Sequence, residues 1–122
     1  MKFLVGYEGN DQSVRAVSWT VERARAGGDD LTVAVFTRPG GDRSVDALRT
    51  EVEAILADEG TEAAVQTIEG HPGSSLVELA ERHDVDQLVI GGGTETPTGK
   101  VRLGSVTEFV VVNATTTVTL VR

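Results

Sequence analysis

Residues 87–113 read QLVIGGGTETPTGKVRLGSVTEFVVVN, and this stretch decides the fold that the sequence predicts. The apolar run at residues 87–90 has the length of a buried strand, and three glycines follow it. A helix is predicted from Ser105 to about Asn113, where Ser105 and Glu108 have the spacing of a capping box. A strand that leads into a helix through a glycine-rich loop is typical of parallel α/β sheets.

The same alternation of strand and helix extends over the whole chain. Further strands are predicted at residues 2–6, 31–37, 64–68 and 118–121, each a short run rich in apolar or β-branched residues. Apolar residues at helical spacing occupy the segments between them, with one helix start at Asn10 or Asp11 and another at a capping box of Ser75 and Glu78. Residues 1–122 are therefore predicted to form one α/β domain, with a single open parallel five-stranded sheet and helices on both faces.

The composition excludes several kinds of site and partner. The chain has no cysteine, so a disulfide framework, a thiolate zinc site and a cysteine nucleophile are excluded. Nineteen acidic residues against eleven basic ones give a net charge of -8, which disfavours binding to nucleic-acid phosphates. No apolar run approaches the roughly 20 residues that span a bilayer, and the N-terminus does not resemble a signal peptide, so a cytoplasmic protein is expected. The acidic excess, the scarcity of lysine and the abundance of threonine and valine favour an origin in high salt, as in a haloarchaeal protein; a GC-rich genome is an alternative reason for the preference of arginine over lysine.

The loop after the strand at residues 87–90 is the strongest candidate for a binding site. Ligands of open parallel sheets bind beyond the carboxyl ends of the strands, where the strand order reverses. The glycines of this loop allow backbone N–H groups to approach an anion, and the following helix offers a positive N-terminus. Because the loop also contains Lys100, the sequence predicts an anionic ligand.

Three familiar phosphate-related patterns do not fit this sequence. The P-loop pattern fails because Thr94 replaces its first glycine and Val101 replaces its metal-binding hydroxyl. The dinucleotide pattern lacks its third glycine after the first strand. A phospho-receiver domain is discarded because Tyr7 and Glu8 stand where paired acids are needed.

The loop and its flanks resemble the universal stress protein family. The nucleotide-binding branch of that family carries G-x2-G-x9-G-[S/T] after its fourth strand. Gly91 matches the first glycine, and Gly104 with Ser105 matches the closing pair at the expected distance. Thr94 stands at the second glycine position, so the ATP-binding type of motif is partly altered here.

Both ends of the chain carry the same resemblance. The closing stretch GSVTEFVVVNATTTVTLVR, residues 104–122, is similar to the last helix and strand of the family. The opening stretch VGYEGNDQSVRAVSWTVERA, residues 5–24, is similar to its first strand and helix, with Glu8 where an aspartate is usual. The resemblance implies a Rossmann-like sheet of order 3-2-1-4-5, similar to that of adenine nucleotide alpha hydrolases. It also implies a homodimer formed through the last edge strand, from Val118 to Val121.

The resemblance further implies a site for ATP or another adenine nucleotide, with Mg²⁺, between the first and fourth strands. Glu8 would lie near the ribose, the phosphates or the metal, and Tyr7 and Phe36 would border the adenine. Lys100 would add positive charge to the loop. The phosphates would contact the loop and the start of the helix, at Gly91, Gly93, Thr94, Gly104, Ser105 and Val106.

Two other functions stay open on the sequence alone. A homodimeric interaction or regulatory module of the same fold would bind no nucleotide, and a slow ATPase is a weaker third alternative because no catalytic constellation is visible. The candidate residues also have structural interpretations. Ser105 can be a helix cap, the glycines a plain turn, Glu8 and Lys100 solvated charges, and His71 an exposed turn residue.

Overall fold

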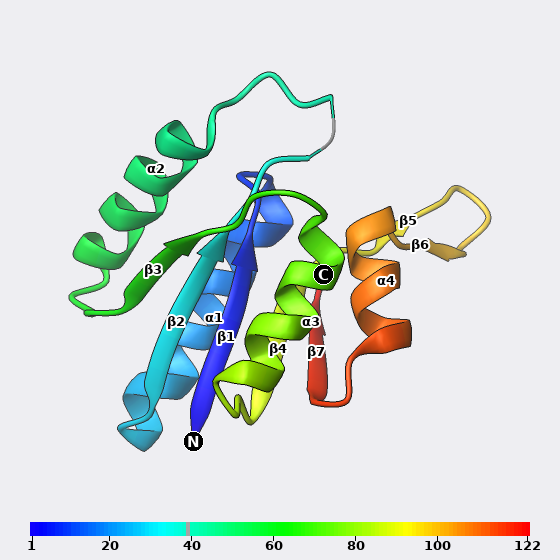
Figure 1. Ribbon diagram of the computed structural model, residues 1–122. Helices are drawn as coiled ribbons and strands as arrows, with labels where there is room; N and C mark the ends of the chain where they lie inside the picture. Colours follow the sequence, from blue (N-terminus) through cyan, green and yellow to red (C-terminus); the bar gives the residue numbers. More distant parts are fainter. Residues whose placement is uncertain (39) are drawn as a thin grey trace.

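The structure is a computed structural model that describes residues 1–38 and 40–122. Within these residues the main sheet has five parallel strands, in the order β3-β2-β1-β4-β7. The strands are β1 (Lys2–Tyr7), β2 (Asp30–Val35), β3 (Ala64–Thr67), β4 (Gln87–Gly91) and β7 (Thr117–Val121). Figure 1 shows β3 and β7 as the two edges of the sheet, on opposite sides of β1. The predicted α/β class and the order 3-2-1-4-5 are confirmed, with β7 as the fifth strand.

Four helices of the described residues cover the two faces of this sheet (Figure 1). α1 (Asp11–Gly27) and α2 (Val45–Asp58) pack on one face. α3 (Pro72–Arg82) and α4 (Ser105–Asn113) pack on the other. No helix in this described part of the chain is both long and apolar enough to cross a membrane.

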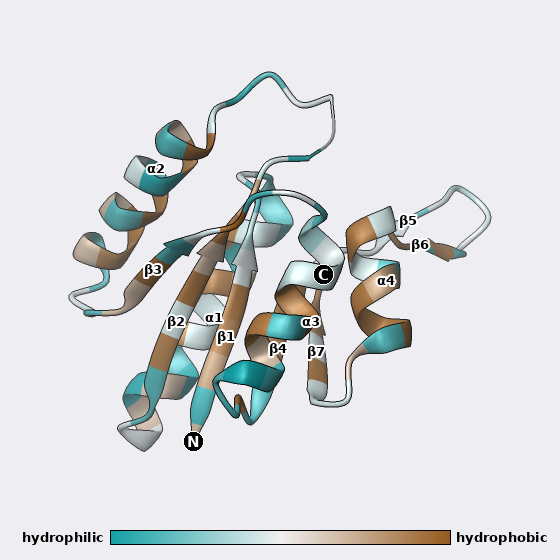
Figure 2. Ribbon diagram, viewed as in Figure 1, coloured by the Kyte–Doolittle hydropathy of each residue, from teal (hydrophilic) through white to brown (hydrophobic). Residues whose placement is uncertain are grey.

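The alternation of side chains along each strand supplies both cores. In β1, Phe3, Val5 and Tyr7 join the cluster formed with α1 and α2, whereas Leu4 joins the cluster formed with α3 and α4. All four side chains are buried. Because the central strands are buried on both faces, they read as continuous apolar runs in the sequence. Figure 2 shows these apolar segments in the middle of β1 and β2.

Side-chain caps begin both α1 and α3, but only the first was predicted correctly. Asn10 Oδ1 accepts a hydrogen bond from the Ser13 N–H at 2.8 Å, which confirms the predicted start of α1. α3 begins earlier than predicted, at Pro72, and its cap is His71, whose Nδ1 accepts a backbone N–H at 3.0 Å. The predicted start at Ser75 is wrong because proline fits the first helical turn, where the chain needs no N–H donor.

Residues 91–104, expected to form an irregular loop, contain a short hairpin. β5 (Thr94–Glu95) pairs with the antiparallel strand β6 (Val101–Arg102). The Thr96 N–H donates to the Lys100 carbonyl oxygen at 2.7 Å and closes the turn. Figure 1 shows the hairpin projecting outward beyond α4.

The end of β4 passes very close to the start of α1 at Gly91. A Cβ at this position would lie 2.4 Å from the carbonyl oxygen of Gln12 and 2.8 Å from the amide nitrogen of Ser13. Both of these atoms belong to the backbone, so neither can swing aside as the end of a side chain would. The packing of β4 against α1 therefore requires glycine at residue 91, independently of any ligand.

We predict that G91A lowers the free energy of unfolding by about 2 kcal/mol, because the added methyl group overpacks a rigid backbone contact. Urea denaturation followed by circular dichroism measures this change. G104A is the matched control, since a Cβ at Gly104 meets no atom within 4 Å and its φ of -68° suits alanine. A G91A protein as stable as G104A would contradict the close approach.

Candidate functional site

A hollow opens at the carboxyl ends of β1 and β4. In the main sheet, β1 is followed by β2, which lies on one side of it. β4 is followed in this sheet by β7, which lies on the other side, so the strand order reverses between β1 and β4. The hollow has a volume of about 240 Å³. Its lining comes from the segments after β1, β2 and β4 and from the start of α4, and consists of Glu8, Asn10, Gln12, Arg38, Gly91, Gly92, Gly93, Thr94, Gly104, Ser105, Val106 and Thr107.

The start of α4 lies at this hollow without a side-chain cap. Gly104 is the N-cap residue, and among the described residues no side chain caps the helix. Ser105 is therefore the first helical residue, so the predicted capping box with Glu108 is wrong: the helix begins one residue too early for Ser105 to be its cap. The first N–H groups of a helix have no partner inside the helix, and they carry its positive dipole end. This helix start can therefore accept an anion.

A small polar network forms the opposite wall of the hollow. Glu8 Oε1 accepts hydrogen bonds from Arg38 Nη2 at 2.8 Å and from Asn10 Nδ2 at 2.6 Å. Asn10 therefore has two functions, because its Oδ1 also caps α1. The Glu8 N–H in turn donates to Ser13 Oγ at 3.1 Å. These contacts fix the segment after β1 against the first turn of α1.

The structure brings most of the predicted site residues together around the hollow. Thr94, which replaces the second glycine of the motif, lies in β5 and pairs with Arg102 of β6. A β-branched residue suits this strand position. The other predicted residues that line the hollow are Glu8, Gly91, Gly93, Gly104, Ser105 and Val106.

Tyr7 and Phe36, predicted to border the adenine, lie outside the hollow. Both side chains are buried, on opposite faces of the sheet. The Tyr7 hydroxyl donates to the Glu51 carboxylate of α2, which also accepts a hydrogen bond from Arg43. Phe36 packs closely over Gly6: a Cβ added at Gly6 would lie only 3.2 Å from a carbon atom of the Phe36 ring. The burial of both side chains makes them core residues in this structure.

Lys100, predicted to supply positive charge, also lies away from the hollow. It stands at the exposed turn between β5 and β6, where its N–H donates to Thr96 Oγ1 at 3.2 Å. The hairpin geometry carries this part of the loop outward from the sheet. The basic side chain that does line the hollow is Arg38, which follows β2.

Five residues that line the hollow are not among those predicted from the sequence. The position of Arg38 after β2 could have indicated it. β2 lies beside β1, and residues that follow adjacent parallel strands lie together at the carboxyl ends of those strands. Asn10 was recognised only as a helix cap. The remaining three are Gln12, Gly92 and Thr107.

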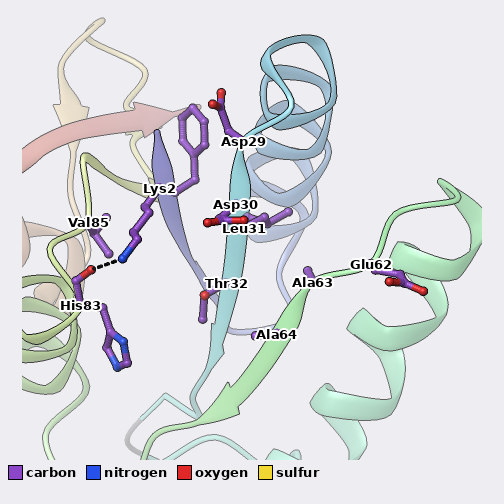
Figure 3. A pocket seen from close by; sticks show the side chains of 11 residues that line it. Lys2, Asp29, Asp30, Leu31, Thr32, Glu62, Ala63, Ala64, His83 and Val85 are labelled. Atoms are coloured by element: carbon purple, nitrogen blue, oxygen red, sulfur yellow. Dashed lines mark hydrogen bonds between the residues drawn. The ribbon is translucent and has the colours of Figure 1, made fainter.

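A larger hollow, of about 560 Å³, lies at the other end of the strands, near the amino ends of β1, β2 and β3. Figure 3 shows Asp29, Asp30 and Glu62 around it, with Lys2 Nζ donating to the His83 carbonyl oxygen at 3.4 Å. Its carboxylates disfavour a phosphate ligand. Over residues 1–38 and 40–122, no three His, Cys, Asp or Glu side chains are placed to hold a metal ion.

The whole length of the chain, residues 1–122, matches the model of one family, described as the universal stress protein family. The chain belongs to the universal stress protein family. Family members with solved structures show the same fold over nearly all of both chains. A universal stress protein from Archaeoglobus fulgidus is 26% identical with a TM-score of 0.80, and the match covers 100% of this chain and 98% of that one.

Two further solved structures of universal stress proteins contain nucleotides. A universal stress protein in complex with cAMP is 28% identical, with a TM-score of 0.78, and the match covers 100% of this chain and 96% of that one. A universal stress protein from Archaeoglobus fulgidus in complex with dAMP is 23% identical, with a TM-score of 0.76 and coverage of 100% and 98%. A search of curated protein sequences found no match.

Glu8 was also predicted as a ligand of Mg²⁺, and the network around it bears on that role. In the described residues it supplies the only carboxylate that lines the hollow. Its Oε1 already accepts two hydrogen bonds, from Arg38 and Asn10. A single engaged carboxylate is a poor site for an ion that prefers six oxygen ligands. The described residues that line the hollow therefore do not form a metal site by themselves.

Tyr7 and its contact with Glu51 generate a prediction about pH. Burial, reinforced by the hydrogen bond to Glu51, raises the pKa of Tyr7 above its ordinary value of 10.0. Above that pH the unfolded chain loses the phenolic proton while the folded chain retains it, so the free energy of unfolding falls as pH rises, by up to about 1.4 kcal/mol per pH unit.

In Y7F this contribution is absent, because phenylalanine does not titrate. We expect Y7F to be less stable than the wild type by about 1 kcal/mol near pH 8, through the lost hydrogen bond, and to approach or exceed its stability near pH 11. Urea denaturation at both pH values measures the difference. If the free energy of unfolding changed with pH in the same way in Y7F and the wild type, the folded protein would not retain the Tyr7 proton as predicted.

Proposed function

We propose that this universal stress protein binds an adenine nucleotide in the hollow between β1, β4 and α4, and that the nucleotide regulates its part in a stress response. The observation that carries the proposal is the uncapped start of α4 at the point where the strand order reverses. The relative solved in complex with cAMP supports it, because that protein is 28% identical and the shared fold covers 96% of its chain.

The phosphate of the nucleotide is the part that this hollow recognises best. Backbone N–H groups of the first turn of α4 are available to its oxygens, and the helix dipole favours its negative charge. Gly92 and Gly93 leave that side of the hollow free of large side chains. The Arg38 guanidinium adds the only positive side chain among the described residues that line the hollow.

ATP with Mg²⁺ is one form of this proposal, and AMP is another. Both fit the same recognition of a phosphate, but ATP needs its Mg²⁺ to be held mainly by the nucleotide and by water, since Glu8 is already engaged. A dissociation constant in the micromolar range or weaker is expected, equivalent to roughly -8 kcal/mol or less favourable. No catalytic step is proposed.

Two measurements test the proposal. Mass spectrometry of the supernatant after denaturing the purified protein detects co-purified AMP, ADP or ATP. Isothermal titration calorimetry then measures the affinity for AMP and for ATP, the latter with and without Mg²⁺. A protein that carries no nucleotide and binds neither compound would overturn the proposal, and the interaction module that binds no nucleotide would remain.

We predict that G104L abolishes nucleotide binding and leaves the fold intact. A Cβ at Gly104 meets no atom within 4 Å, so the leucine side chain extends into free space beside the start of α4, where the phosphate is proposed to bind. Calorimetry with AMP and ATP measures the loss, and circular dichroism checks the fold. V112L is the matched control, because Val112 lies on the same helix with 73% of its surface exposed. An unchanged affinity in G104L would remove the start of α4 from the site.

We also propose that the chain forms a homodimer through β7. β7 is an edge strand whose neighbour in the sheet is β4, so one side of its backbone is free to pair with another chain. Val118, Leu120 and Val121 are only half-buried in the single chain. A two-fold contact between two copies of β7 would cover both the backbone groups and these apolar side chains.

Sedimentation equilibrium tests the homodimer, and we expect twice the monomer mass of 12.9 kDa in both low and molar salt. An apolar edge contact is expected to persist in high salt because salt screens charges but not apolar burial. A monomer mass at high protein concentration would contradict the contact. The cytoplasmic location, the high-salt origin and the lack of nucleic-acid binding stay predictions.

A further inference from the structure

Arg38 occupies a distinctive position in an acidic protein. The chain has a net charge of -8, and of the described residues lining the hollow only Arg38 is basic. It lines the hollow together with the first residues of α4, so one cation and one positive helix end border the same space. Its side chain is 63% exposed, and its carboxylate partner in the structure is Glu8.

Arg38 is the exposed end of this ion pair, at 63%, while the Glu8 side chain is 16% exposed. Fully exposed pairs contribute between nothing and about 1 kcal/mol because water competes for the partners, and here water competes for the guanidinium. Arginine binds phosphate oxygens through two parallel charge-assisted hydrogen bonds, which are stronger than a single contact to one carboxylate oxygen. A phosphate group in the hollow therefore competes well for the guanidinium.

Glu8 does not become isolated when Arg38 leaves it. Asn10 Nδ2 donates to the same Oε1 atom at 2.6 Å, and Asn10 is fixed as the cap of α1. The carboxylate, which is 16% exposed, therefore keeps the hydrogen bond from Asn10 while Arg38 contacts a ligand. The exchange needs only the movement of one exposed side chain, with no change in the backbone.

We infer that Arg38 is the side chain that binds the ligand's phosphate, and that it exchanges its contact with Glu8 for that contact when a nucleoside monophosphate enters the hollow. This inference rests on the proposed nucleotide site and adds to it a residue that determines specificity. It gives the hollow a means of distinguishing a nucleotide from its nucleoside. Glu8 then acts as the internal competitor that holds Arg38 in the empty protein.

The experiment compares AMP with adenosine, which differ by the phosphate alone. Calorimetry at low ionic strength and near-neutral pH measures both affinities for the wild type, R38Q and R82Q. R82Q is the matched control, since Arg82 also forms an exposed ion pair, with Glu78, but lies at the end of α3 and outside the hollow. We expect R38Q to weaken AMP binding about tenfold and R82Q to leave it unchanged.

Adenosine binding separates a phosphate contact from a structural effect. R38Q is expected to bind adenosine as the wild type does, so the preference for AMP over adenosine should shrink by the same factor of about ten. E8Q should strengthen AMP binding several-fold, because it removes a negative charge and the competitor of Arg38.

The outcomes distinguish this inference from the proposed nucleotide site. If the wild type binds AMP and R38Q binds it equally well, the role of Arg38 is overturned and the nucleotide site stands. Equal weakening of AMP and adenosine in R38Q also overturns it, because a phosphate contact cannot act on adenosine. E8Q binding AMP no more tightly than the wild type overturns the exchange. A wild type that binds neither compound overturns both.

Discussion

Because Gly91 has no side chain, two turns of the chain can lie in direct backbone contact. At that point the backbone that leaves β4 lies directly against the backbone that begins α1, with no space even for a methyl group. The turn after β1 carries Glu8 and Asn10, and the turn after β4 leads to the hairpin and then to α4. The contact therefore sets the relative position of the two walls of the hollow before any ligand enters. A site whose walls are already in place loses less conformational entropy on binding.

The distribution of charge then decides what the hollow can accept. Most of the surface of an acidic chain repels anions, and local features must overcome that field. Here the local features are the uncapped start of α4 and the guanidinium of Arg38. Neither belongs to a metal-ligating cluster of the residues described, so the proposed anion site does not depend on a metal site in the protein.

The fold could be predicted from the sequence because each strand and helix has a local pattern of its own. Short apolar runs alternate with segments of helical spacing, and that alternation leaves few topologies other than a parallel sheet with crossovers. The order of strands also agreed, through the resemblance of both ends of the chain to one family. Errors in the helix starts arose where proline and glycine moved the boundary, at Pro72 and at Gly104, so that a serine spaced correctly for a cap was already inside the helix or at its first position.

The sequence places residues at the hollow where the backbone determines their position, and less well where side-chain direction does. Gly104 and Ser105 line the hollow as expected, because position along the chain is enough to place a helix start. Tyr7 and Phe36 lie in the two cores instead, because adjacency to a strand end does not reveal whether a side chain points into a core. Lys100 lies outside the hollow because residues 94–102 form a hairpin that no sequence pattern indicated. Arg38 lines the hollow but belongs to no motif, so the sequence did not indicate it.

The hairpin of β5 and β6 has a consequence for how this protein can diversify. It is attached at one rim of the hollow, its residues are exposed, and its two strands pair with each other rather than with the main sheet. Insertions, deletions or new side chains at its tip would alter what surrounds the entrance without disturbing either core. Descendants of this gene could therefore acquire new ligand preferences or contacts with other macromolecules by remodelling a peripheral appendage, while the architecture that supports it is inherited unchanged.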